Sequence, residues 1–365
     1  MINWLACKPD LEESIERVDA WLNGKKVDRP PVRFSRHNEE YISQNIDNTR
    51  WPSLKARWFD TEFQLDLFEE KLKNKIFHGE TFPVFWPNLG PNVFAACYGC
   101  PYEFGDVTAW AEPGLFEDQP HHPDIQLKNG LPQINWDSEY IRKLDSMTER
   151  ALERAQGKYL VGYTDMHPGL DMVAAMRGTQ QVLFDVYDDP EIITTLSTHF
   201  HQDFLKFFNR YDAMLKKADQ YSVTWMNIPA KGKLHIPSCD FSAMISPEQF
   251  KNLAWSGLAA ETAEMDYNIF HLDGPGVARQ IDSILQLPKI NAIQWVQGMG
   301  TDTPIMQWVP FIKKIQESGK GVIVDLALSE LEGFMAQMDP HGIFLCVATA
   351  NESQEIEVIS KIKKW

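Results

Sequence analysis

The sequence predicts an α/β protein built as a (β/α)8 TIM barrel with an N-terminal helical extension. From residue 137 to the C-terminus, short apolar runs alternate with longer segments of helical periodicity. The runs are apolar almost throughout, which is typical of parallel strands that are buried on both faces. No glycine-rich dinucleotide fingerprint follows any run, so the alternative of an open doubly wound sheet agrees less well with the sequence.

The elements can be assigned in chain order. Helical periodicity begins at 11–22 and returns at 53–73. Two prolines, Pro30 and Pro31, exclude a helix and favour an extended run over 31–35. Strands are expected at 83–86, 159–163, 222–226, 268–272, 292–296, 321–326 and 342–347, with 31–35 as the candidate for the eighth. Helices are expected at 189–217, 247–265, 304–318 and 352–363.

We expect residues 1–365 to form a single domain. Residues 1–80 carry too little apolar sequence for a core of their own, so we expect them to pack on the barrel. The chain has 44% hydrophobic residues and a net charge of −16, which argues against nucleic-acid and anionic-membrane partners. A small molecule or another protein is the better partner class.

Cysteine usage and the N-terminus predict a cytoplasmic protein. No signal peptide is evident, and no run approaches the roughly 20 apolar residues of a membrane span. The five cysteines are too scattered for a disulfide framework, which fits a reducing compartment. Cys97 and Cys100 have C-x-x-C spacing, but no second pair completes a zinc site, so we interpret them as buried thiols.

The stretch 268–276 provides the strongest candidate site. Its apolar run ends in His271-Leu272-Asp273 and breaks on Gly-Pro-Gly. Residues i and i+2 of a strand share a face, so His271 and Asp273 can point together into a barrel mouth. Chemistry in a barrel lies just after the strands. The corresponding positions elsewhere are Tyr163, Asp165, His167, Asn227, Cys239, Asp240, Trp295, Gln297, Asp325 and Cys346.

Three of these residues are a chemically sound metal-ligand set. A catalytic zinc ion takes three protein ligands and keeps a fourth position open. His271, Asp273 and Cys346 offer nitrogen, oxygen and sulfur donors, and we predict that they bind one zinc-like ion. The competing interpretation is a His271–Asp273 pair that does acid–base work, with Cys346 merely packed in the wall.

Five motifs, in this order, resemble the uroporphyrinogen decarboxylase superfamily. They are Arg29-Pro-Pro-Val, Gly162–Leu170, Asp240–Phe250, Phe270–Gly274 and the closing strand with Cys346. The resemblance implies a (β/α)8 barrel, often a homodimer, and two branches of enzymes. One branch removes carboxyl groups from a tetrapyrrole without a cofactor. The other contains zinc methyltransferases that move a methyl group between a corrinoid protein and a thiol such as coenzyme M.

Departures from the family pattern distinguish the branches. The decarboxylases carry Arg-Gln-Ala-Gly-Arg where this chain has Arg36-His37-Asn38-Glu39-Glu40. An anion in place of the second arginine repels a polycarboxylate, so tetrapyrrole decarboxylation is not expected. The methyltransferases resemble the chain at His271 and Cys346, but Asp273 occupies their first cysteine position. A carboxylate is an acceptable zinc ligand and makes the metal a stronger Lewis acid.

We therefore predict a zinc-dependent methyltransferase that acts on a small molecule or a corrinoid protein. The alternatives are a cofactor-free decarboxylase or lyase acting on a small carboxylate, and a non-catalytic barrel that binds a small molecule. Arg36 and His37 are expected to bind an anionic substrate group. The predicted catalytic residues are Asp240, Asp165 and His167, and the predicted substrate-binding residues are Arg36, His37, Tyr163, Trp295 and Gln297.

Overall fold

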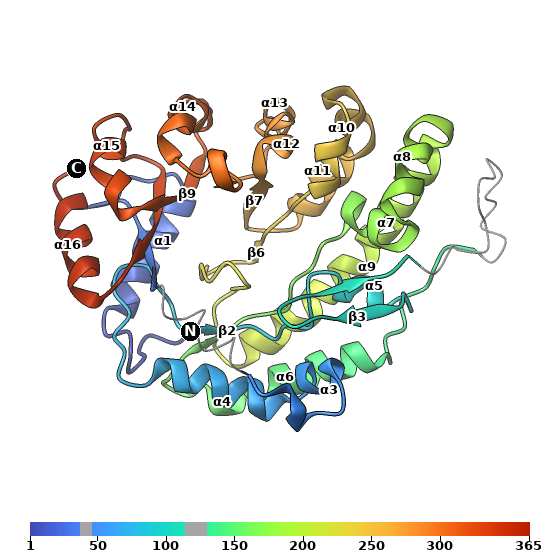
Figure 1. Ribbon diagram of the computed structural model, residues 1–365, viewed down its shortest axis with the longest axis horizontal. Helices are drawn as coiled ribbons and strands as arrows, with labels where there is room; N and C mark the ends of the chain where they lie inside the picture. Colours follow the sequence, from blue (N-terminus) through green and yellow to red (C-terminus); the bar gives the residue numbers. More distant parts are fainter. Residues whose placement is uncertain (37–45, 114–129) are drawn as a thin grey trace.

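Six parallel strands form a curled sheet in the order β1-β10-β9-β8-β7-β6 (Figure 1). The computed structural model describes residues 1–36, 46–113 and 130–365, with only the backbone of Arg36. The strands of the sheet are β1 (Val32–Arg36), β6 (Leu234–His235), β7 (Tyr267–Asp273), β8 (Ala292–Val296), β9 (Gly321–Ala327) and β10 (Ile343–Thr349).

Two short sheets accompany the six strands. β2 (Val84–Phe85) and β5 (Leu160–Val161) pair in parallel, and β3 (Tyr102–Phe104) and β4 (Ala109–Ala111) form an antiparallel pair. The backbone N–H of Glu80 donates to the Val32 carbonyl of β1 (2.6 Å), and that of Tyr163 donates to the Val223 carbonyl (3.0 Å). The fold is therefore α/β with a curled parallel sheet, as the apolar runs predict.

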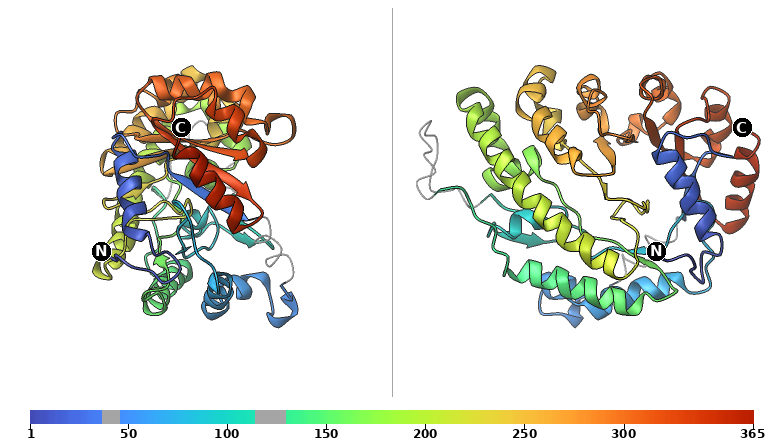
Figure 2. Two further views of the ribbon diagram at one scale, coloured as in Figure 1. Left: turned by 90° about the vertical axis from the view of Figure 1, so that its left-hand side faces the viewer. Right: turned by 180° about the vertical axis from the view of Figure 1, so that it is seen from behind.

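Helices lie around the outside of the curled sheet (Figure 2). No helix of the described ranges is long and apolar enough to cross a membrane. The helices are α1 (Leu11–Leu22), α3 (Leu54–Trp58), α4 (Thr61–Leu72), α5 (Val93–Ala96), α6 (Glu139–Arg154), α7 (Gly169–Arg177), α8 (Thr179–Asp188), α9 (Pro190–Lys217), α10 (Pro247–Leu253), α11 (Trp255–Ala263), α12 (Gly274–Ala278), α13 (Ile281–Ile284), α14 (Val309–Glu317), α15 (Leu331–Met335) and α16 (Glu352–Ile362), with 3-10 turns η1 (Asn48–Arg50), η2 (Asp240–Met244), η3 (Gly300–Asp302), η4 (Ile305–Trp308) and η5 (Leu328–Glu330).

Several expected elements differ from the observed ones. The helix expected over 53–73 is two helices, because the Asp60 side chain accepts a hydrogen bond from the Phe63 N–H (3.0 Å) and starts α4 afresh. The strand expected over 222–226 is reduced to an isolated bridge between Ser222 and Ala230. The chain turns back at Asn227, whose φ of 55° is left-handed and ends extended structure.

Alternation along the strands separates two apolar cores. Ile269, Ala292, Ile323 and Phe344 belong to the core inside the curled sheet. The residue after each of them packs instead with the surrounding helices. Helix α1 adds its apolar face to the inner core and covers the amino-terminal ends of the strands, where the indole N–H of Trp21 donates to the Gly342 carbonyl (2.8 Å).

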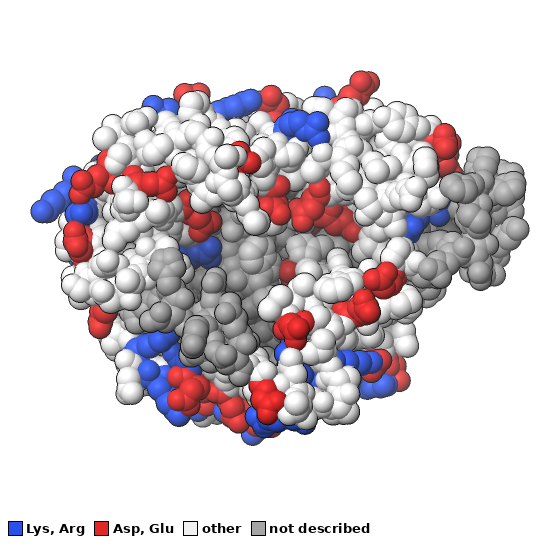
Figure 3. Space-filling view, viewed as in Figure 1, with Lys and Arg blue, Asp and Glu red and all other residues white. Residues whose placement is uncertain are grey.

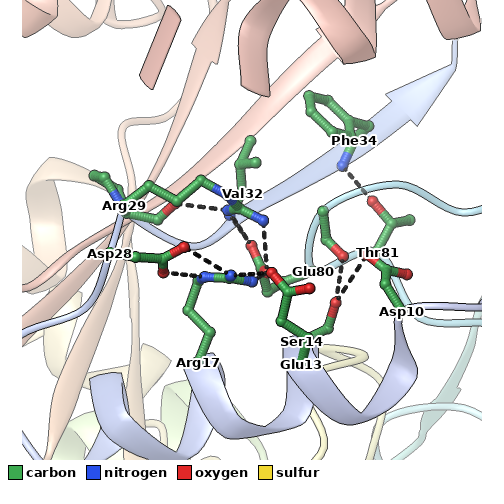
Figure 4. Close-up of polar contacts among 12 residues, drawn as sticks. Asp10, Glu13, Ser14, Arg17, Asp28, Arg29, Val32, Phe34, Glu80 and Thr81 are labelled. Carbon is green, nitrogen blue, oxygen red and sulfur yellow. Dashed lines mark hydrogen bonds and ion pairs between the residues drawn. The ribbon is translucent and has the colours of Figure 1, made fainter. Parts of the chain in front are cut away.

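Residues 1–80 do more than pack against the sheet, because β1 is one of its strands and pairs with β10. A buried ion cluster ties this segment together (Figure 4). The Glu80 carboxylate accepts hydrogen bonds from Arg17 (2.7 Å), from Arg29 (2.8 and 3.0 Å) and from the Val32 N–H (2.7 Å). Glu80 is completely buried, so these four bonds fix α1 and the start of β1 to one another.

Candidate functional site

Three potential metal ligands meet at the carboxyl end of the sheet. One ligand atom each of Asp240, His271 and Asp273 lies within 4.8 Å of the others. His271 and Asp273 project from the same face of β7, as their i and i+2 spacing predicts. Asp240 opens η2, which follows the β6 chain where Ser238 bridges to His271. Figure 3 shows Asp and Glu atoms along the upper wall of the central hollow.

The ring of His271 is oriented by the neighbouring strand. Its Nδ1 lies 2.7 Å from Oε1 of Gln294, which is its direct register partner on β8. An amide oxygen can only accept, so Nδ1 donates, and the neutral ring has its lone pair on Nε2. The Trp225 ring packs edge-on against the imidazole, with ring centroids 5.2 Å apart. The arrangement is that of a histidine prepared to bind a metal through Nε2.

Negative charge accumulates around Asp240. Burial and the nearby Asp171 carboxylate, followed by Asp273, raise the pKa of Asp240 to about 6, although His271 and His167 oppose the shift. Like charges in one site disfavour joint ionisation, and either a proton or a metal cation relieves the repulsion. The three carboxylates therefore form a site that favours a cation.

A second polar cluster stands beside the first. His167 Nε2 lies 2.9 Å from Oδ1 of Asp165, and its Nδ1 lies 2.8 Å from the hydroxyl of Ser238. Burial alone would lower the pKa of His167, but the charge and hydrogen bond of Asp165 raise it to about 9. The structure thus brings the predicted Asp165 and His167 together as an ion pair, with the imidazole charged at neutral pH.

Asp171 on α7 joins the two clusters and was not among the residues predicted from the sequence. It accepts hydrogen bonds from the Ser238 hydroxyl (2.9 Å) and from the N–H groups of Asp240 and Phe241 (both 3.0 Å). These bonds hold η2, and so Asp240, against α7. Its local signal is its place in the first turn of α7, where an acidic side chain is favoured.

Cys346 does not belong to the three-residue ligand group found among the described residues. Its Sγ accepts a hydrogen bond from Nε of Arg33 on β1 (2.8 Å), which is its register partner. Burial raises the pKa of the thiol, although the Arg33 charge opposes the shift. The predicted set of His271, Asp273 and Cys346 is therefore brought together only in part, and Asp240 takes the third place.

The predicted substrate-binding residues lie in different environments. Trp295 is buried outside the sheet against Trp308 and Phe311, with centroids 4.9 and 4.7 Å away. Tyr163 is buried against Phe208 of α9 (5.1 Å). The amide of Gln297 donates to the Thr303 and Asp325 carbonyls (both 2.9 Å). The side chain of Arg36 and all of His37 lie outside the described residues.

The fold resembles that of a solved methyltransferase. The methyltransferase from Methanosarcina mazei superposes on the chain with a TM-score of 0.59 and covers 96% of this chain and 98% of its own. The two sequences are 10% identical, so the similarity is one of fold. No family model matches the sequence, and no curated protein matches it.

Proposed function

We propose that this chain is a metal-dependent methyltransferase of the uroporphyrinogen decarboxylase type, and that its strands complete a closed (β/α)8 barrel. The observation that carries the proposal is the Asp240–His271–Asp273 group at the carboxyl end of the sheet. The fold shared with a methyltransferase over 96% of the chain supports it. Barrel enzymes keep their chemistry at this end of the strands.

The donor set suits a zinc ion. One imidazole nitrogen and two carboxylate oxygens are three ligands of the kind that catalytic zinc takes. Gln294 supplies the outer hydrogen bond that metal-binding histidines have. A zinc ion held by Asp240, His271 and Asp273 would supply a Lewis acid that activates the group undergoing methyl transfer. In this proposal Asp240 replaces Cys346 as the third ligand.

The chain's own residues would position the substrate. A groove of about 470 Å³ lies beside the ligand group, and its lining includes Asn92, His167, Asp171, Asp240, Phe241 and Met244. Its size suits a small molecule. His167 lines the groove, and its two ring nitrogens are held by Asp165 and Ser238. The fixed imidazole ring would position the substrate beside Asp240.

Partner assignments rest on the sequence resemblance. A methyl group carried on a corrinoid partner protein, a thiol acceptor and assembly as a homodimer all follow from the zinc methyltransferase branch. A cytoplasmic location belongs to the same proposal, and the acidic chain disfavours a nucleic-acid or membrane partner.

A metal-free lyase is the second candidate function. It is favoured by the raised pKa of Asp240, which places the carboxyl at about 6, near the range where a general acid–base group works best. His167 and Asp165 would then do proton chemistry on a small carboxylate.

Methyl transfer from free methylcobalamin to a thiol tests the proposal. The methyl group leaves cobalt for sulfur, cobalt keeps the bonding electron pair as cob(I)alamin, and the thiol proton is released. The change in corrinoid absorbance reports the rate. Zinc-loaded wild-type protein should accelerate the reaction with coenzyme M or another small thiol. Asp240→Asn should lose at least about 100-fold of that rate, in line with the loss of a metal ligand, and Cys346→Ser should keep it. Release of CO2 from a small carboxylate, with no methyl transfer to any thiol or from any methoxy or methylamine donor, would favour the lyase and overturn the proposal.

A further inference from the structure

A second cavity, of about 300 Å³, lies between β1 and residues 68–84 and reaches side chains of β9 and β10. Arg33, Asp325, Cys346 and Asn227 line it, and none of them belongs to the metal-ligand group. The register places Arg33 beside Cys346 and Cys346 beside Asp325, so three polar side chains lie in one row across three strands. The proposed methyl-transfer chemistry makes no use of this row.

Arg33 has a fixed guanidinium with an open edge. Its Nε donates to Cys346 Sγ (2.8 Å) and its Nη1 donates to the Met226 carbonyl (2.6 Å). Across residues 1–36, 46–113 and 130–365, Nη2 has no hydrogen-bond partner, and no carboxylate lies within ion-pair distance of the guanidinium. Two bonds thus hold the plane of the group while its far edge faces the cavity. A planar edge of this kind binds a carboxylate through two parallel hydrogen bonds.

Three buried arginines of the described residues differ from Arg33, because each makes a direct ion pair. Arg17 and Arg29 each make direct ion pairs with Glu80, at 2.7 and 2.8 Å, and Arg177 pairs directly with Asp185. Within the part of the chain that the structure describes, Arg33 makes no direct ion pair with a carboxylate, and its charge is supported by Cys346 and by the more distant Asp325. The pKa of Asp325 is itself raised by burial. A cation enclosed by protein without a direct counter-ion is costly, and a bound anion would relieve that cost.

The rest of the cavity wall accepts hydrogen bonds. Oδ1 of Asn227 is buried and has no hydrogen-bond partner among the described residues. The Asp325 carboxylate is a second acceptor on the same wall. The Asp325 carboxylate already interacts with the Cys346 thiol, whereas a bound carboxylate alone would leave Asn227 Oδ1 unsatisfied, which is unfavourable for a buried polar group. A ligand that carries a donor next to its carboxylate would satisfy Asn227 and could share Asp325.

We propose that this cavity binds a small carboxylate with an adjacent amino or hydroxyl group, the pattern of an amino acid or a hydroxy acid. The carboxylate lies on Arg33, and the donor lies on Asp325 and Asn227. Cys346 belongs to the same inner core as Ile269, two residues before His271, so the cavity and the metal-ligand group share the concave side of the sheet. Figure 3 shows Lys or Arg atoms at the left wall of the hollow and acidic atoms along its upper wall. Binding of this ligand does not depend on the proposed methyl transfer.

Binding of glycine, glycolate and acetate to metal-free protein, measured by ligand-observed NMR, tests the proposal. Glycine or glycolate should bind at least 10-fold more tightly than acetate, and the better of the two identifies the donor as amino or hydroxyl. Arg33→Met should weaken binding at least 30-fold. Arg33→Lys should bind more tightly than Arg33→Met but less tightly than the wild type. Lys71→Met removes another cation that lines the cavity and should leave binding unchanged.

Two further variants test the role of Asn227 and the independence of this cavity from the metal-ligand group. Asn227→Gly keeps the left-handed backbone available and removes the buried acceptor, so it should reduce the preference for glycine or glycolate over acetate. Asp240→Asn should bind the ligand as the wild type does, which separates this site from the metal centre. Folding of each variant is checked by circular dichroism. Equal binding of acetate, no carboxylate binding to the wild type at millimolar concentrations, or undiminished binding by folded Arg33→Met would overturn the proposal.

Discussion

Nδ1 of His271 lies 2.7 Å from Oε1 of Gln294, across the β7–β8 pair. This bond keeps the Nε2 lone pair directed to the site shared with Asp240 and Asp273. Gln294→Leu removes the acceptor, so the imidazole can rotate or change tautomer. Loss of such an outer partner weakens metal binding by about 10- to 100-fold.

Competition with a zinc-chelating dye measures that change. Gln133→Leu, at an exposed position, is the matched control and should bind zinc as the wild type does. Equal zinc affinity of the Gln294 variant and the wild type would show that the hydrogen bond does not orient a ligand.

The His167–Asp165 pair predicts an unusual imidazole titration. The pKa of His167 is raised to about 9 in the folded protein, above its usual 6.5. The charged His167–Asp165 pair therefore stabilises the folded protein fully below pH 6.5, and this contribution is lost as the pH rises through 9. NMR should show the ring protonated at pH 7.5 in the wild type, and Asp165→Asn should bring its titration below pH 7.

The same pair makes stability depend on pH. Between pH 6 and pH 10, urea unfolding should show a wild-type advantage over Asp165→Asn that shrinks by on the order of 2–3 kcal/mol, following the size of the shift. Taking the difference between the two proteins removes the contribution of other groups that titrate in this range. An advantage that stays constant with pH would rule out a charged His167.

Glu80 should be among the side chains that matter most for stability. Its buried carboxylate pairs with Arg17 and Arg29 (Figure 4). Glu80→Gln removes the direct counter-ion of the buried Arg29, whereas Arg17 keeps Asp28. Removing one partner of a buried ion pair lowers the free energy of unfolding by about 3–5 kcal/mol. Chemical unfolding measures the loss. Glu13→Gln removes an exposed partner of the same Arg17 and should cost less than about 1 kcal/mol.

Local patterning predicted the strand that carries the site. The apolar run before His271, its period of two and the Gly-Pro-Gly break are all sequence-local, so β7 and the shared face of His271 and Asp273 could be predicted. The same parity separates Gln294, which points inward to His271, from Trp295, which points outward to Trp308. Position at the strand end alone points to Trp295, whereas the alternation along β8 points to Gln294 as the partner of His271.

Contacts between distant parts of the chain determine which other side chains reach the site, and local sequence patterns do not report such contacts. Asp240 reaches the site because Asp171, 69 residues earlier, accepts the N–H of Asp240 and fixes η2. Cys346 is held by Arg33, 313 residues away, because β1 pairs with β10. No local periodicity reports bonds across such separations, so the sequence alone could not predict that Asp240, and not Cys346, groups with His271 and Asp273. The break between α3 and α4 could have been predicted from the sequence, because Asp60 is a helix-capping residue inside the helical pattern and is therefore a local signal.

Metal content measured on purified protein and three variants tests the central claim most directly. Each protein is incubated with excess zinc, freed of unbound ion by gel filtration and analysed by mass spectrometry for metal per chain. The wild type and Cys346→Ser should each retain about one zinc ion, because Cys346 lies outside the ligand group. Asp240→Asn and His271→Ala should retain little or none. No zinc on the wild type, or zinc that survives Asp240→Asn but is lost in Cys346→Ser, would contradict the proposed centre.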